Sequence, residues 1–144
     1  MRHEEGTFNT HDGEALYTQW WYPDDGVVKA HLAVVHGLGE HSGRYEDFAA
    51  WFVPLGYDVH AFDLRGHGQS PGERGHIRAW KDVRGDVHVF LAEVQQRGPD
   101  APLFLIGHSL GGLIVLEYGL FGEVDALSGL IASGPALARG EGVS

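Results

Sequence analysis

The sequence predicts a mostly parallel, doubly wound α/β sheet that starts with an antiparallel hairpin. Three observations favour this class. Short apolar stretches alternate with helical patterns of ordinary length along the chain. The 144 residues match the size of one domain. A content of 43% hydrophobic and 21% charged residues is typical of a globular protein. We therefore expect one sheet with helices on its faces.

The first predicted element is a β-hairpin over residues 8–22. Its turn is His11-Asp12-Gly13, and residues 16–22 are rich in β-forming side chains. The next predicted strand, residues 31–35, is nearly continuously apolar. This pattern is typical of a strand that is buried on both faces in the parallel part of a sheet.

A short helix is predicted next, because four apolar side chains recur at the spacing of one helix face: Tyr45, Phe48, Ala49 and Phe52. Gly56 follows where a helix commonly ends in a left-handed glycine. Residues 57–62 have the composition of a further strand, and a glycine-rich loop covers residues 65–75.

A longer helix is predicted from a second apolar stripe: Trp80, Val83, Val87, Phe90 and Val94. Residues 103–106 and 127–132 are the last two predicted strands, and residues 110–120 between them are apolar around most of the helix circumference. This last helix is expected to be buried. We also expect the four tryptophans to pack in the core or against the sheet rather than to face lipid.

The charge balance, 10 basic against 20 acidic residues, excludes a nucleic-acid-binding protein, which needs clustered lysine and arginine. The chain has no cysteine, so disulfides and thiolate zinc sites are excluded. It also has no His-Glu-x-x-His pair, and we expect neither a metal nor a cofactor. Neither a signal peptide nor a membrane-spanning stretch is recognisable. A cytoplasmic location is expected, with contact to lipid surfaces left open.

The strongest functional signal is the sequence Gly107-His108-Ser109-Leu110-Gly111, between a predicted strand and a predicted helix. In a nucleophile elbow, a serine in a sharp strand-to-helix turn projects its hydroxyl from the carboxyl end of the sheet. Glycines on both sides avoid collisions where the chain folds back, and the helix N-terminus favours negative charge in front of the serine. Ser109 is therefore the predicted nucleophile; the alternative is a glycine-rich turn that contains a serine.

A second signal is His36-Gly37-Leu38-Gly39, at the carboxyl end of the first predicted parallel strand. Acyl transfer needs two hydrogen-bond donors for the developing oxyanion, and these are commonly backbone N–H groups. The predicted donors are the N–H groups of Leu38 and Leu110. Gly37 and Gly39 would let the loop approach the serine, and His36 is expected to form structural hydrogen bonds. His108 is expected to point away from Ser109.

The chain resembles the amino-terminal part of α/β-hydrolase-fold serine hydrolases, and more narrowly the monoacylglycerol lipase/lysophospholipase group. Three blocks carry the resemblance: His36-Gly37-Leu38-Gly39-Glu40-His41-Ser42-Gly43-Arg44-Tyr45, Asp63-Leu64-Arg65-Gly66-His67-Gly68-Gln69-Ser70, and Gly107 to Gly112. The resemblance implies that residues 1–144 are the amino-terminal part of one such domain. It also implies hydrolysis of a monoacylglycerol-like or other single-chain lipid ester, with Ser109 as nucleophile and an oxyanion hole formed by Leu38 and Leu110.

One departure from the family pattern concerns the catalytic triad. The fold orders its triad as serine, then acid, then histidine, but the chain contains no histidine after Ser109. We therefore expect the cap, the catalytic acid and the catalytic histidine to come from a second polypeptide or from a C-terminal segment outside this chain. The cap and the last two strands of the fold would lie there too.

Several activities share this arrangement and remain open. A lysophospholipase, a broad carboxylesterase or a thioesterase would use the same residues, because the cap and pocket set the acyl length. A different class of protein is a truncated hydrolase fold that binds a partner without catalysis. Reactivity of Ser109 towards a serine-directed phosphonate separates the enzyme from the binding protein.

Overall fold

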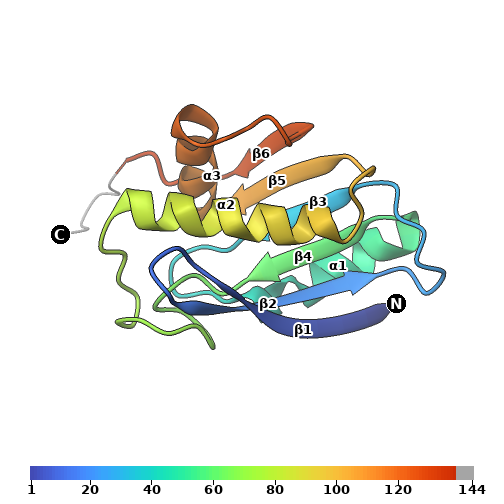
Figure 1. Cartoon of the computed structure of the whole chain (residues 1–144), viewed down its shortest axis with the longest axis horizontal. Helices are drawn as coiled ribbons and strands as arrows, with labels where there is room; N and C mark the ends of the chain where they lie inside the picture. Colours follow the sequence, from blue (N-terminus) through green and yellow to red (C-terminus); the bar gives the residue numbers. More distant parts are fainter. Residues whose placement is uncertain (139–144) are drawn as a thin grey trace.

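Within residues 1–138, which the computed structural model describes, six strands form one sheet in the order β1-β2-β4-β3-β5-β6 (Figure 1). The strands are β1 (Arg2–Asn9), β2 (Ala15–Tyr22), β3 (His31–Val35), β4 (Asp58–Phe62), β5 (Leu103–His108) and β6 (Gly129–Ser133). Strands β1, β2 and β4 pair antiparallel, and β4, β3, β5 and β6 pair parallel. The predicted class of a mostly parallel sheet with a hairpin at its start is confirmed.

The hairpin is longer than the sequence predicted. β1 begins at Arg2 rather than at Phe8, because residues 2–9 all pair with residues 15–22 of β2. Its first residues are mainly charged or polar and exposed, so hydrophobic spacing gave no sign of them. At the turn, Gly13 adopts a left-handed φ of 86°, and the Glu14 N–H donates to Thr10 Oγ1.

Helices cover both faces of the sheet (Figure 1). On one face lie η1 (Ser42–Tyr45), α1 (Glu46–Phe52) and η2 (Val53–Leu55). On the other face lie α2 (Trp80–Gln96) and α3 (Leu110–Phe121). The first predicted helix is thus one short α-helix between two 3₁₀ turns, which end at Gly56 with a φ of 99° as its position predicted.

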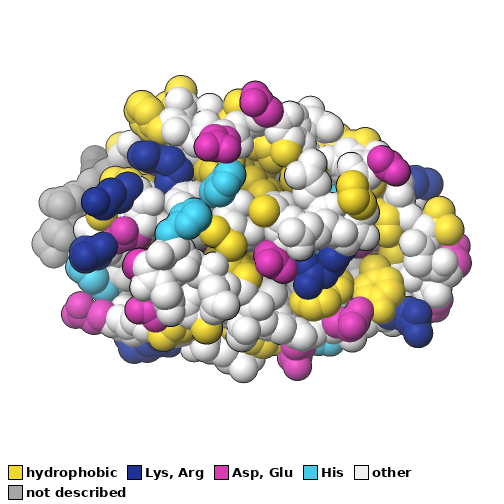
Figure 2. All heavy atoms as spheres, in the orientation of Figure 1, with side chains coloured by type: hydrophobic (Ala, Val, Ile, Leu, Met, Phe, Trp, Pro, Cys, Tyr) yellow, Lys and Arg dark blue, Asp and Glu magenta, His cyan; other side chains and the backbone are white. Residues whose placement is uncertain are grey.

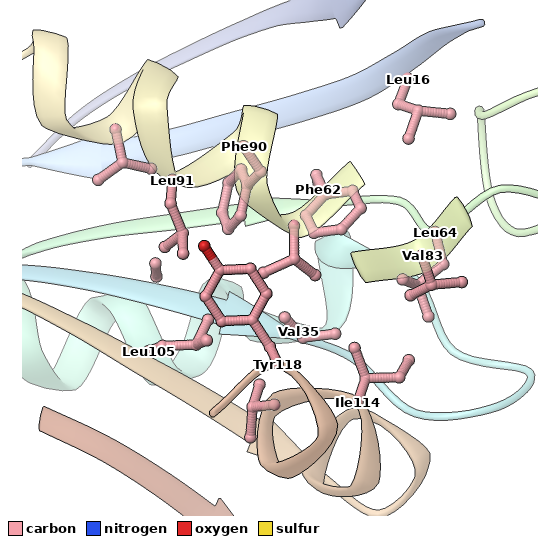
Figure 3. Close-up of a cluster of buried hydrophobic side chains, with 14 of the residues drawn as sticks. Leu16, Val35, Phe62, Leu64, Val83, Phe90, Leu91, Leu105, Ile114 and Tyr118 are labelled. Carbon is pink, nitrogen blue, oxygen red and sulfur yellow. The ribbon is translucent and has the colours of Figure 1, made fainter. Parts of the chain in front are cut away.

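The larger core lies between the sheet and the pair α2 and α3 (Figure 3). Val83, Val87 and Phe90 of α2 all belong to this core, as the predicted stripe required, and the Phe90 ring packs 4.6 Å from that of Phe62 of β4. Tyr118 of α3 enters the same cluster, where its hydroxyl donates to the Glu123 carbonyl. The core therefore fixes both helices on the same side of the central strands.

The expectation that the tryptophans all pack inside is wrong for two of them. Trp21 is buried, but Trp51 of α1 and Trp80 at the start of α2 have 73% and 41% of their surface exposed. Trp80 lies in the first turn of α2, beyond the part of the helix that the sheet covers. The apolar stripe was continuous in sequence, but only its members from Val83 onward reach the core.

The prediction that the last helix is buried holds for only one of its faces. Ile114, Val115 and Tyr118 are buried, but Leu120 and Phe121 are 77% and 67% exposed. Hydrophobic side chains lie over α3 at the upper left of the space-filling view (Figure 2). Beside this helix, β6 is the outermost strand of the sheet that residues 1–138 form. None of the helices in that part of the chain combines the length and apolar character needed to cross a membrane.

Candidate active site

Ser109 lies at the turn between β5 and α3 in a strained backbone conformation. Its φ of 57° and ψ of −116° make it the one non-glycine residue among residues 1–138 with a positive φ. The Ser109 N–H donates to the Ser133 carbonyl at 3.0 Å, and its own carbonyl accepts from the N–H groups of Leu113 and Ala136. Strained conformations of this kind persist only where their surroundings hold them, and they concentrate at functional sites.

The glycines on both sides of Ser109 are required by close packing. A Cβ on Gly107 would lie 2.1 Å from the Gly111 carbonyl oxygen, and a Cβ on Gly111 would lie 2.1 Å from that of Val35. Backbone atoms at such distances cannot move aside cheaply. The tight turn therefore depends on glycine at both positions, as the motif predicted.

The loop after β3 reaches the same turn. An added Cβ on Gly37 would lie 3.3 Å from both Ser109 Cβ and the His108 carbonyl oxygen, so this backbone packs directly against the nucleophile turn. Gly39 adopts a left-handed φ of 72°, which favours glycine. The loop that carries Leu38 thus lies beside the turn that carries Ser109 and Leu110.

The two residues predicted to supply oxyanion donors lie in the loop after β3 and at the start of α3. Leu110 is the first residue of α3, and the first N–H groups of a helix have no partner inside it. Leu38 is 64% exposed and lies between Gly37, which packs against the Ser109 turn, and Gly39. The positive end of the α3 dipole adds to the attraction for negative charge in front of Ser109.

Glu40 holds the loop that carries Leu38 in shape through two hydrogen bonds to Gly37. Its Oε2 accepts the Gly37 N–H at 2.6 Å, and its own N–H donates to the Gly37 carbonyl at 3.2 Å. These two bonds close a tight loop around Leu38. The signal was present in the sequence as an acidic residue three positions after Gly37, but the same spacing occurs in many surface turns.

His36 is fully buried and uses both ring nitrogens for structural hydrogen bonds. Nδ1 lies 2.7 Å from the Gly37 carbonyl, to which it donates, and Nε2 accepts the Leu64 N–H at 3.0 Å. Burial lowers the pKa of His36 to about 4, so the ring is neutral at pH 7. The structure therefore places His36 as a link between two loops, with no free nitrogen to act as a base.

No other histidine of residues 1–138 hydrogen-bonds the Ser109 hydroxyl. His108 is exposed, and its Nδ1 lies 3.4 Å from Ser133 Oγ. His67 is buried with Nδ1 3.1 Å from the Arg65 carbonyl, and its ring packs 5.2 Å from that of His36. Within residues 1–138, the hydroxyl of Ser109 therefore has no histidine hydrogen-bonded to it.

Asp63 joins the surrounding loops from a buried position directly after β4. Its Oδ1 accepts the Ser42 N–H at 2.6 Å, and its Oδ2 accepts the Gln69 N–H at 2.8 Å. Gly68 must be a glycine here, because a Cβ would lie 2.2 Å from Asp63 Oδ2. One carboxylate therefore holds both η1 and the glycine-rich loop beside the site.

The family model described as serine aminopeptidase, S33, matches residues 26–143. The chain belongs to this family. The matched region contains Ser109, both predicted oxyanion positions and every strand from β3 to β6.

Its relatives are lipases and esterases of the α/β-hydrolase fold. The chain is 40% identical over 136 residues to monoglyceride lipase from Homo sapiens, covering 86% of this chain and 42% of the relative. It is 37% identical over 145 residues to monoacylglycerol lipase from Mycolicibacterium smegmatis, covering 97% and 49%. This S33-family chain is thus an α/β hydrolase of the monoglyceride lipase type, as its motifs predicted.

Solved structures agree with this assignment. A carboxyl esterase from Bacillus coagulans in complex with glycerol superposes with a TM-score of 0.79 at 31% identity, covering 91% of this chain and 44% of the esterase. A soluble variant of monoglyceride lipase from Saccharomyces cerevisiae gives 0.76 at 31% identity, covering 94% and 45%. The S33-family chain spans less than half the length of each of these four relatives.

Proposed function

We propose that this chain carries the nucleophile and oxyanion hole of a hydrolase for single-chain lipid esters. The observation that carries the proposal is the strained backbone of Ser109, held between Gly107 and Gly111 and packed against Gly37. Such a turn is costly to maintain in a protein that has no use for a serine hydroxyl at this position. Relatives named monoglyceride lipase support a monoacylglycerol-like substrate.

The proposed reaction is acyl transfer in two steps. Ser109 Oγ attacks the ester carbonyl carbon while its proton passes to a histidine outside this chain. The N–H groups of Leu38 and Leu110 hold the resulting oxyanion. The histidine then protonates the departing alcohol, and water releases the fatty acid from the acyl-serine. Lysophospholipase, carboxylesterase or thioesterase activity would follow the same steps with another substrate.

The exposed face of α3 supports the proposal that a further segment completes the domain. A groove of about 660 Å³ runs beside this helix, and its lining is almost entirely apolar: Trp80, Leu113, Leu116, Leu120, Phe121 and Leu130. Contiguous apolar surface of this kind is normally covered by another part of the protein. We infer that the covering segment carries the cap, the acid and the histidine. The cytoplasmic location stays a prediction of the sequence.

The test is fluorophosphonate labelling of the complete protein, followed by mass spectrometry of the peptides. We expect one adduct, on Ser109, and loss of activity towards a p-nitrophenyl ester in Ser109→Ala. Removal of the triad serine lowers turnover by about 10⁶-fold in a serine hydrolase. The matched control is Ser128→Ala, an exposed serine directly before β6 and at the end of this strand away from Ser109, which should leave both adduct and activity unchanged.

Unchanged esterase activity in Ser109→Ala would overturn the nucleophile assignment. A complete protein without any adduct would favour the alternative of a hydrolase fold that binds a partner without catalysis.

A further inference from the structure

Three side chains that suit a metal ion meet at the end of the sheet opposite to Ser109. His31 opens β3 and pairs in register with Asp58, which opens β4, and His60 is two residues further along β4. Alternate residues of a strand share a face, so all three point to the side of the sheet that α2 covers. All three are buried, and their ligand atoms lie within 4.8 Å of one another.

The hydrogen bond of His31 defines which nitrogen faces the cluster. Nε2 lies 2.8 Å from the Gly98 carbonyl oxygen, which can only accept, so Nε2 carries a proton. Nδ1 then faces Asp58, 2.8 Å from both carboxylate oxygens. A ring nitrogen and a carboxylate in this position attract each other only if a proton or a metal ion lies between them. A backbone carbonyl behind a histidine is also the usual support of a metal ligand.

His60 gives a second, independent observation. It is 1% exposed, and its Nε2 is one of two buried side-chain atoms in residues 1–138 with no hydrogen-bond partner. This nitrogen lies 2.8 Å from Asp58 Oδ2, but without the alignment of a hydrogen bond. A buried polar atom without a partner is costly, and a bound cation would remove that cost.

A pocket leads from the surface to the cluster. Its lining includes Asp58 together with Glu4, Trp20 and Arg97. The C-terminal end of α2 lies above it, because Arg97 caps this helix and Gly98 follows. A helix C-terminus attracts cations, as does Glu4. Arg97 acts against a cation, but its guanidinium carbon lies 3.7 Å from the Trp20 ring centroid, where the aromatic face holds it.

We propose that His31 Nδ1, Asp58 and His60 Nε2 bind a zinc ion, with water from the pocket as the fourth ligand. Two imidazoles and one carboxylate are donors that zinc accepts, and an open fourth position is common at zinc sites with three protein ligands. The cluster is about 13 Å along β3 from the end that faces Ser109, given the rise of a strand. The ion would therefore stabilise the start of β3 and β4 and take no part in ester hydrolysis.

The competing arrangement is a shared proton in place of the metal. Burial alone would lower the pKa of His31, but Asp58 and the Gly98 carbonyl raise it, which favours an imidazolium–carboxylate pair when no metal is bound. That pair satisfies His31 and Asp58 and leaves His60 Nε2 without a partner. A site that holds only a shared proton takes up no zinc, whereas a metal site binds one equivalent, so titration with zinc distinguishes the two arrangements.

The experiment is zinc titration of the complete protein against a chromogenic chelator, with the thermal midpoint recorded in parallel. We expect one tight equivalent in the wild type and a midpoint that rises with zinc. His60→Gln and Asp58→Asn should each weaken this equivalent by at least about tenfold, since even supporting residues change metal affinity by 10–100-fold. His11→Gln removes an exposed histidine of the hairpin turn and is the matched control.

Equal zinc binding in the wild type and all three variants would overturn the proposal, because the ion would then sit on surface histidines. Cobalt substitution of the wild type keeps the test independent of how the variants fold. A tetrahedral cobalt spectrum with one equivalent supports the site, and an octahedral spectrum overturns it. Fluorophosphonate labelling of Ser109 should be the same with and without zinc, so failure of this proposal is distinct from failure of the proposed hydrolase.

Discussion

At the residue scale, His36 joins the loop after β3 to the loop after β4. Its single neutral tautomer serves both bonds, because Nδ1–H donates to Gly37 and Nε2 accepts from Leu64. A proton added to Nε2 would set two N–H groups against each other. The loop that carries Leu38 therefore depends on an uncharged imidazole.

This dependence predicts a loss of stability in acid. The pKa of His36 is lowered to about 4, mainly by burial, whereas an unfolded histidine titrates near 6.5. The unfolded state therefore binds more protons between pH 6.5 and 4, and the free energy of unfolding falls by up to about 3 kcal/mol as pH falls through this window. His36→Gln removes the titrating group. We expect it to be less stable than wild type at pH 7 and to close that gap at pH 4.5.

The measurement is urea unfolding of the complete protein at both pH values. Since the other titrating groups are shared, only the difference between wild type and variant reports on His36. The exposed His11→Gln serves as the control and should keep a constant difference from wild type. A gap for His36→Gln that is the same at both pH values would contradict the prediction.

Residues with a local signal could be predicted from the sequence, and residues defined by distant contacts could not. The turn at Ser109 is recognisable in the sequence, because its serine and glycines lie within five residues. The steric contact between Gly107 and Gly111 that requires glycine acts within the same stretch. His31 and His60 are 29 positions apart in the chain. Only the parallel register of β3 and β4 brings them together. The expectation of no metal site was based on short motifs, which cannot detect such a pair.

At the scale of elements, Arg65 connects the glycine-rich loop, the hairpin turn and α2. Its Nε and Nη2 donate to the Asp86 carboxylate at 2.7 and 2.6 Å, and its Nη1 donates to Asp12 at 2.9 Å. Asp86 is only 2% exposed, and burial raises its pKa even though Arg65 acts to lower it. The positive charge of Arg65 thus offsets the cost of burying the Asp86 carboxylate of α2.

Arg65→Met should therefore destabilise the fold by about 3 kcal/mol, because removal of one partner leaves a buried charge. The loss should be larger at pH 8 than at pH 5, since the stranded Asp86 carboxyl becomes neutral more easily at the lower pH. Urea unfolding at both pH values measures it. Arg65→Lys should recover only part of the loss, because an ammonium cannot donate in the paired geometry of a guanidinium.

The control for this prediction is Arg78→Met. Arg78 pairs with Asp82 one helical turn away, but its side chain is largely exposed, so we expect a change of at most about 0.5 kcal/mol. Equal losses of unfolding free energy in Arg65→Met and Arg78→Met would show that the buried contact to Asp86 stabilises the fold no more than an exposed ion pair does.

Element types were predictable because the apolar spacing of each strand and helix is set by its own period. Element ends were less so. β1 extends to Arg2 through pairing with β2, a contact between different segments that the polar spacing of residues 2–7 does not reveal. Trp80 continues the stripe of α2 in sequence, yet the sheet does not extend under it. The spacing of apolar residues predicts whether a segment is a helix or a strand, and contacts with neighbouring segments decide at which residue it ends.

At the scale of the whole molecule, the two sides of the sheet differ in what they leave exposed. The hairpin at one side ends in a strand with mainly polar residues, which protect an edge from pairing. At the other side, β6 carries no charged residue, and the exposed Leu120 and Phe121 of α3 line a groove together with Leu130 of this strand. An apolar edge of this kind next to an apolar helix face favours association.

We therefore expect the isolated chain of residues 1–144 to self-associate through α3 and β6. Sedimentation velocity over a range of concentrations measures this. Leu120→Lys combined with Phe121→Ser should shift the distribution towards monomer, because both side chains are exposed and contribute little to the core. A change of two exposed side chains has a small effect on folding compared with its effect on an apolar contact surface.

The matched control is Trp51→Ser, which removes a large side chain that is just as exposed, but from α1 on the opposite face of the sheet. If surface hydrophobicity in general drives association, this variant should also shift the chain towards monomer. If the α3 face drives it, Trp51→Ser should behave as the wild type while the α3 variant does not. A wild-type chain that stays monomeric at every concentration would contradict the prediction. It would mean that α3 and β6 need no covering segment, which would remove one support of the proposal that another part of the protein supplies the histidine and acid.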